Sequence, residues 1–195
     1  MTLTSPAGIE WTRIFSSLSH TLSGSFVYYS PRSSDMASTD GEHEAVTTLR
    51  EYLRVRTDHP QPDYAAAVAF LQRYLATHLP ELPTRIVGSH ADRPILIATL
   101  EGSDPTLPSI LLNSHTDVVM ADRARWDHEP FAAIKDEQQR IYGRGVQDMK
   151  SVTIQYLEAI RTIKRELDAS GQKVHSLIER ASPLICRSCI AHSCD

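Results

Sequence analysis

Apolar residues recur with helical spacing in two stretches of the first half of the sequence. Val46, Leu49 and Leu53 follow one another at intervals of three and four, which predicts a helix with one buried face. A second helix is predicted to begin after the N-cap Asp63 and to end before Pro80, because proline cannot continue a helix. The apolar stripe of this second helix is Ala67, Leu71, Tyr74 and Leu75.

Short apolar runs separated by turn residues predict strands in the middle of the chain. Asp92-Arg93-Pro94 and Ser103-Asp104-Pro105 are turn signals between the first three of these runs. The third run is almost wholly apolar, as expected of a strand that is buried on both faces of a sheet. The predicted strands are residues 84–87, 95–100, 109–114 and 173–178.

A longer amphipathic helix is predicted from about Met149 to Leu167, between the third and fourth strands. The order of helices, strands, helix and strand is typical of an α/β fold in which helices pack on a sheet. The apolar stripe of the long helix is Val152, Tyr156, Ile160, Ile163 and Leu167.

Composition and charge narrow the class of protein. The 195 residues make one domain or part of a larger one, and a hydrophobic content of 41% is enough for a core. The net charge of −4 provides no basic field for phosphate, which argues against nucleic acid as a partner. No apolar run approaches about 18 residues, so no membrane span is expected. All three cysteines lie in the last ten residues, which fits a reduced intracellular protein, and we expect a cytoplasmic location.

The two ends of the chain read differently from its centre. Residues 1–38 are rich in serine and threonine and are predicted to be a disordered extension. A transit peptide is the alternative, but acidic and basic residues balance there and no cationic face forms. Residues 179–195 are predicted to be a divergent, disordered tail whose cysteines and histidine crowd too closely for a tetrahedral zinc site. The folded unit is expected to span residues 39–178.

Candidate chemistry lies in two motifs. His115 follows an apolar run, at the carboxyl end of a predicted strand, where functional residues gather in such sheets. Asp117, two residues along, is placed to hold one ring nitrogen of His115 while the other nitrogen binds zinc. Asp148 stands before the long helix, where backbone N–H groups stabilise its charge, and Gly143 and Gly145 allow a tight turn beside it. Each signal alone is weak; the order and flanking residues favour a metal site.

The flanking residues resemble the aminoacylases of a dinuclear-zinc metallopeptidase family. The resemblance covers about residues 40–175 and implies a partial three-layer zinc-exopeptidase-like catalytic domain, with helices packed on a mixed sheet. The motifs that carry it are Leu53-Arg54-Val55-Arg56-Thr57, Asn113-Ser114-His115-Thr116-Asp117-Val118-Val119 and Tyr142-Gly143-Arg144-Gly145-Val146-Gln147-Asp148-Met149-Lys150.

The resemblance also implies roles for three residues. His115 would bind one zinc ion, Asp148 would bridge two, and Asp117 would act in catalysis by holding His115 in its metal-binding tautomer. The implied activity is hydrolysis of N-acyl-L-amino acids to a carboxylic acid and a free amino acid. The resemblance implies a cis peptide bond between Asp148 and Met149, whereas a trans or mixed population is expected in the isolated chain without zinc.

The sequence departs from the family after about His175. The adjacent pair of glutamates that supplies the general base and a ligand is not present; the corresponding stretch holds only Glu179. Two later ligands and the dimerisation domain of this homodimeric family are also not found. We therefore expect a truncated form that is inactive alone, and the alternative is a non-catalytic isoform or interaction fragment.

Overall fold

The computed structural model describes residues 42–88, 90, 92–174 and 178–182. The predicted extension, residues 1–38, and residues 183–195 of the predicted tail lie outside this part. The elements in chain order are α2 (Glu44–Arg54), α3 (Tyr64–His78), β1 (Thr84–Val87), β2 (Ile95–Leu100), β3 (Ile110–Asn113), η1 (Arg123–Arg125), β4 (Ile134–Lys135), β5 (Ile141–Tyr142), η2 (Val146–Lys150), α4 (Ser151–Ser170) and β6 (Ile178–Ser182).

The helices begin and end at residues whose chemistry explains the boundary. The Asp63 carboxylate accepts a hydrogen bond from the backbone N–H of Ala66 at 2.9 Å, which confirms the predicted N-cap of α3. Helix α4 continues three residues beyond the predicted end, Leu167, and stops at Gly171, which has a φ of 66°. Glycine reaches this left-handed conformation without a Cβ clash and commonly terminates helices.

The buried face of α4 differs in part from the predicted stripe. Ile160, Ile163 and Leu167 are buried as expected, whereas Val152 and Tyr156 are only half-buried. Two residues outside the predicted stripe, Ile154 and Leu157, are buried instead. The face turns because the N-terminal half of α4 packs against both α2 and the sheet, so a wider arc of the helix is covered.

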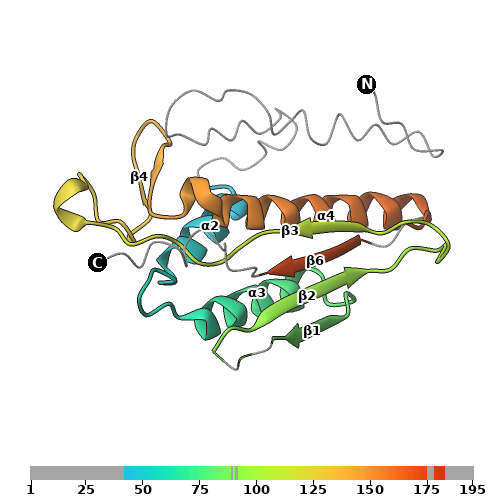
Figure 1. Ribbon diagram of the computed structural model, residues 1–195. Coiled ribbons are helices and arrows are strands. Elements are labelled where there is room, and N and C mark those ends of the chain that lie inside the picture. The colour runs from blue at the N-terminus through green and yellow to red at the C-terminus, as the bar shows by residue number, and fades with distance from the viewer. Residues whose placement is uncertain (1–41, 89, 91, 175–177, 183–195) are drawn as a thin grey trace, which may run out of the picture.

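Four strands form a mixed sheet in the order β1-β2-β6-β3. β2 pairs antiparallel with both β1 and β6, while β3 pairs parallel with β6, and α4 lies in the connection between β3 and β6 (Figure 1). The predicted strand 173–178 is displaced: β6 shares only Ile178 with it and extends into residues assigned to the tail. The pairing of Ile178 with both Leu100 of β2 and Ile110 of β3 sets the position of β6.

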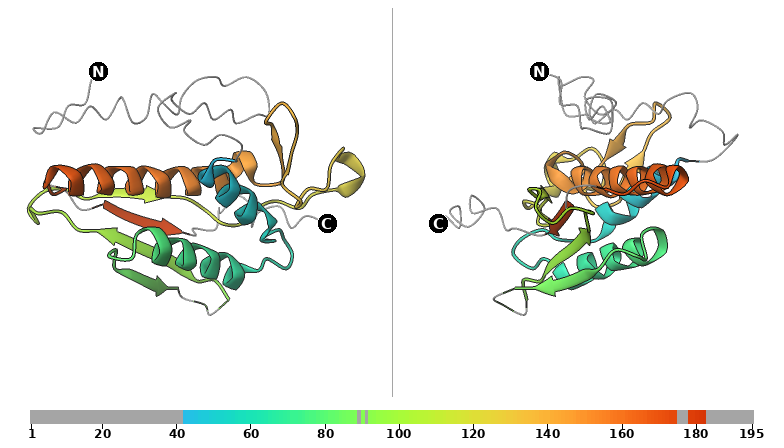
Figure 2. Two further views of the ribbon diagram at one scale, coloured as in Figure 1. Left: turned by 180° about the vertical axis from the view of Figure 1, so that it is seen from behind. Right: turned by 90° about the vertical axis from the view of Figure 1, so that its right-hand side faces the viewer.

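The helices lie on one face of this sheet. Leu96, Ala98 and Leu100 alternate along β2, so they point to the same face, and they share a buried cluster with residues of α3 and α4. Figure 2 shows α3 and α4 on the same side of the strands in its side view. The described residues therefore form two layers, helices on a mixed sheet. The third layer of the expected fold is not seen among them.

The prediction that the third strand is buried on both faces is wrong. Ile110 is 42% and Leu111 is 59% exposed in β3. The strand order places β3 at an edge of the sheet; Leu112 is half-buried against the core cluster, whereas Ile110 and Leu111 are exposed. The apolar run therefore did not predict burial correctly, because burial depends on which other helices and strands pack against the strand.

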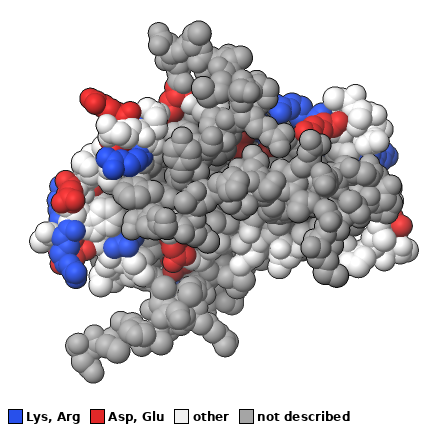
Figure 3. Space-filling view, turned by 90° about the horizontal axis from the view of Figure 1, so that it is seen from above, with Lys and Arg blue, Asp and Glu red and all other residues white. Residues whose placement is uncertain are grey.

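The described surface carries both acidic and basic side chains. Lys and Arg side chains alternate with Asp and Glu side chains on the visible part of the face in Figure 3, with no extended basic patch in that coloured area. Among the described residues, no helix combines the length and the apolar character needed to cross a bilayer.

Candidate metal centre

His115 lies in an irregular segment, residues 114–118, that continues from the end of β3. We call it the His115 segment. The residues around His115 are buried: Ser114 is 0%, Thr116 1% and Asp117 1% exposed. The hydroxyl of Thr57 donates to the backbone carbonyl of Thr116 at 2.7 Å, and the N–H of Val118 donates to the carbonyl of Thr57 at 3.0 Å. These bonds satisfy buried backbone groups that no strand ladder reaches, and they fix the path of the segment.

Asp148 lies in η2, the single wide turn that leads into α4. Gly145, which precedes η2, has a φ of 89°, and a Cβ placed on it would lie 2.8 Å from Cγ1 of Val118. Glycine is therefore required both by the backbone conformation and by the close approach of the His115 segment. The peptide bond between Asp148 and Met149 is cis, as the resemblance implies.

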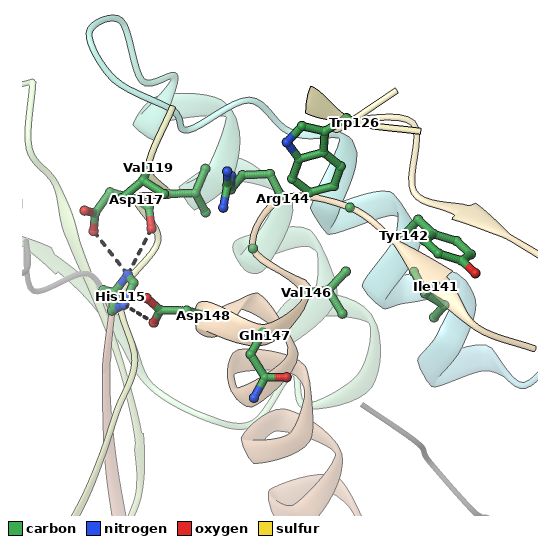
Figure 4. Close-up of a pocket in the computed structure, with 13 residues that line it drawn as sticks. His115, Asp117, Val119, Trp126, Ile141, Tyr142, Arg144, Val146, Gln147 and Asp148 are labelled. Carbon is green, nitrogen blue, oxygen red and sulfur yellow. Dashed lines mark hydrogen bonds and ion pairs between the residues drawn. The ribbon is translucent and has the colours of Figure 1, made fainter. Parts of the chain in front are cut away.

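The imidazole of His115 contacts the two aspartates through different nitrogens (Figure 4). Nδ1 donates to the backbone carbonyl of Asp117 at 2.9 Å and lies 3.3 Å from the carboxylate Oδ1 of the same residue. Nε2 lies 2.9 Å from Oδ1 of Asp148. The structure thus brings the three predicted residues together, although the shorter contact of Asp117 uses its backbone carbonyl rather than its side chain.

The surroundings of His115 favour its protonated form. Hydrogen bonding to the Asp117 side chain raises the pKa of His115 to about 9, against the opposing effect of burial, and the bond to Asp148 adds to the rise. Because a carbonyl oxygen can only accept, the Nδ1 proton is fixed by Asp117. When His115 is neutral, its proton is therefore on Nδ1, and the lone pair of Nε2 faces Asp148.

Asp117 is a buried carboxylate between two histidine rings. Its Oδ2 lies 3.9 Å from Nε2 of His59, and its Oδ1 faces His115. A carboxylate that is only 1% exposed needs compensating charge, which the protonated imidazole of His115 provides. His59 was not predicted as part of the site, and its position after Asp58 gave no signal, because the contact arises only when the two segments pack together.

A pocket with a volume of about 430 Å³ opens beside His115 and Asp148. Trp126, Tyr142 and Arg144 also line it, and the Arg144 guanidinium lies 5.1 Å from the centre of the Trp126 ring (Figure 4). These three residues were not predicted as site residues. Arg144 could have been predicted from the sequence, because it lies within the motif that contains Asp148.

Two of the residues fit a metal ion as ligands. Tetrahedral ligand atoms bound to one zinc ion at about 2.0–2.2 Å lie about 3.3–3.6 Å apart, so the 2.9 Å between His115 Nε2 and Asp148 Oδ1 would have to widen by about 0.5 Å to admit the ion. The Asp148 side chain is 80% exposed, so one carboxylate oxygen remains free for a further ion. No group of three or more metal-binding side chains gathers in the described part of the chain, so these residues supply only part of a coordination shell.

Comparison with known proteins finds a matching family profile and similar sequences. A sequence profile of Peptidase family M20/M25/M40 matches residues 111–181, which include His115, Asp117 and Asp148. The chain is 52% identical over 137 residues to Aminoacylase-1 of Sus scrofa and 48% identical over 134 residues to that of Homo sapiens. These matches cover 70% and 69% of this chain, but only 33% and 32% of the relatives. The chain thus spans about a third of their length.

Solved structures agree on the fold. An M20 family metallo-carboxypeptidase, Sso-CP2 from Sulfolobus solfataricus, superimposes with a TM-score of 0.61 at 22% identity, over 72% of this chain and 30% of that one. The dipeptidase Dug1p from Saccharomyces cerevisiae gives a TM-score of 0.51 at 20% identity, over 71% of this chain and 31% of that one. The chain is therefore a homologue of aminoacylase-1 over about a third of that protein's length, its residues 111–181 match Peptidase family M20/M25/M40, and its described residues have part of the M20 peptidase fold.

Proposed function

We propose that residues 39–178 form the first part of the catalytic domain of a zinc-dependent N-acyl-L-amino-acid amidohydrolase. The observation that carries the proposal is the convergence of His115 Nε2 and Asp148 Oδ1, 2.9 Å apart at the mouth of a pocket. Identity of 52% to an aminoacylase-1 supports N-acyl aliphatic L-amino acids as the substrate class.

The contacts of the three residues support the roles that we propose for them. His115 would bind one zinc ion through Nε2, and Asp148, with an exposed carboxylate, would bridge two. Asp117 would hold the proton on Nδ1 of His115 and so keep Nε2 directed at the metal. The chemistry that zinc supplies in such hydrolases is polarisation of the acyl carbonyl and activation of a water molecule.

The described residues do not supply the rest of a catalytic centre. A general base must lie within hydrogen-bond reach of the water that it deprotonates. Asp117 cannot take this role, because its carboxylate is 1% exposed and already faces two imidazoles. We therefore propose that this chain alone is inactive, and the alternative is that it serves as a non-catalytic isoform or interaction fragment.

A hydrolysis assay tests the proposal. The purified full chain, supplied with zinc, is offered N-acetyl-L-methionine, and the released methionine is measured beside full-length Sus scrofa aminoacylase-1. We expect no turnover by the chain and full turnover by the control. Turnover comparable to the control, and abolished by a chelator, would show that the chain completes its own site and is active.

A further inference from the structure

One short segment contacts both parts of the chain that carry the proposed zinc ligands. Residues 52–58 comprise the last turn of α2 and the chain that leaves it. They supply no proposed ligand, yet the His115 segment is attached to them on one side and η2, which carries Asp148, on the other. The ligands themselves are 33 residues apart in the sequence.

Thr57 makes the attachment to the His115 segment. This side chain is 0% exposed, and its hydroxyl donates to the carbonyl of Thr116 at 2.7 Å. The carbonyl of Thr57 accepts from the N–H of Val118 at 3.0 Å, so the hydrogen bonds of one residue flank Asp117 on both sides. The Tyr52 hydroxyl adds a buried bond to Oγ1 of Thr116 at 3.3 Å.

Lys150 makes the attachment to η2. Its side chain is 1% exposed, and its ammonium donates to the carbonyls of Val55 at 2.6 Å and Tyr52 at 3.1 Å. The same ammonium lies 4.7 Å from the centre of the Tyr52 ring. The last carbonyls of a helix have no partner within the helix, and a cation at this end also meets the negative end of the helix dipole. Lys150 thus joins η2 to the C-terminal end of α2.

The two attachments explain how the ligands are held at a fixed separation. The chain between His115 and Asp148 includes the exposed Val119 and Met120, 51% and 64% exposed, and the short η1, so it does not fix the distance by itself. The buried hydrogen bonds to residues 52–58 fix this distance, because they lose their geometry if the His115 segment or η2 moves. We infer that residues 52–58 set the separation of the His115 and Asp148 side chains, with Thr57 and Lys150 as positioning residues. This inference rests on the proposed zinc site.

Zinc titration of the full chain by calorimetry tests the inference. Thr57→Val and Lys150→Met are each expected to weaken zinc binding by about 10-fold or more, as removal of residues that orient ligands typically does. Thr57→Ser, which keeps the hydroxyl, is expected to bind like the wild type. In an Asp148→Ala background neither substitution should weaken the residual binding further, because each acts through the position of Asp148 relative to His115.

Matched controls separate positioning from general loss of stability. Thr77→Val removes a hydroxyl bond to the Arg73 carbonyl at 2.9 Å in α3, and Lys164→Met removes a half-buried lysine of α4 that pairs with Glu81 and Asp168. Both should leave zinc affinity unchanged. If Lys150→Met does not fold, the Thr57→Val and Thr57→Ser pair decides. Folded Thr57→Val and Lys150→Met chains that bind zinc like the wild type would overturn the inference.

A measurement without metal distinguishes this inference from the proposed function. The nuclear Overhauser contact between the His115 ring and the Asp148 β-protons is expected in the wild type and Thr57→Ser, and should weaken in Thr57→Val and Lys150→Met. Equal intensity in all four chains would overturn the inference. Equal zinc binding by the wild type and His115→Ala would instead overturn the proposed zinc site.

Discussion

Nε2 of His115 lies 2.9 Å from Oδ1 of Asp148, although the two residues are 33 positions apart in the chain. The other nitrogen of the same ring is held by Asp117, whose backbone carbonyl accepts from Nδ1 at 2.9 Å. A proton and a metal ion would compete for Nε2, because only the neutral ring offers a lone pair there. The contact therefore links the proposed metal chemistry of this site to pH.

Zinc content is the first expected outcome. The described residues bring only His115 and Asp148 together as ligands, which leaves most of two coordination shells to water. After dialysis, elemental analysis should find much less than two zinc ions per chain, and His115→Ala should lower the content further. A stable stoichiometry of two would show that other residues of the chain complete both shells.

The stability contributed by His115 is expected to depend on pH. Its folded pKa of about 9 exceeds the ordinary value of 6.5, so its contribution to the free energy of unfolding is fully present below pH 6.5. The contribution is lost as the pH rises through about 9. The measurement is the free energy of unfolding of the wild type minus that of His115→Gln, from pH 6 to pH 9.5, and this difference should shrink as the pH rises.

A second buried group makes the difference measurement necessary. Burial lowers the pKa of Lys150 to about 7, against the opposing charge of Asp58, so its contribution to stability increases as the pH rises above that value. Lys150 is present in both chains and cancels from the difference between the wild type and His115→Gln. A difference that does not change with pH would contradict the raised pKa of His115.

Gly145→Ala is expected to destabilise the chain more than Gly171→Ala. Both glycines have positive φ, 89° and 66°, and an alanine in that conformation costs about 1–2 kcal/mol. A Cβ at Gly145 would also lie 2.8 Å from Cγ1 of Val118, whereas a Cβ at Gly171 meets nothing within 4 Å. Overpacking adds about 1–3 kcal/mol at Gly145 alone. Urea unfolding of both variants measures this, and equal losses would show that the Val118 contact relaxes freely.

Self-association through the exposed edge strand is a further expectation. Leu111 is 59% exposed on β3, and edge strands with apolar side chains promote pairing between chains. Leu111→Lys should reduce aggregation in light scattering with little change in the melting temperature. Leu107→Lys is the control, because Leu107 is 40% exposed but lies outside the strand. A wild-type chain that is monodisperse at high concentration would contradict the expectation.

Local sequence determined the parts of the fold that depend on neighbouring residues. The bounds of β1 and β2 match the predicted strands, and α3 begins after the Asp63 cap with Ala67, Leu71, Tyr74 and Leu75 buried. These features follow from spacing, capping and turn chemistry, which act over a few residues. The motifs around His115 and Asp148 also identified the residues that meet at the candidate site, because their ligand chemistry is encoded in residue type.

Only the tertiary structure decided which segments lie against one another. The exposure of Leu111, the displacement of β6 and the contacts of His59 with Asp117 and of Lys150 with Val55 all depend on parts of the chain that are distant in sequence. The local pattern of apolar residues indicates a helix or a strand, but it does not identify the residues that bury a side chain or the backbone group that it binds. The sequence by itself therefore determined the candidate ligands. The packing of residues 52–58 against the His115 segment and η2 determined the positions of those ligands.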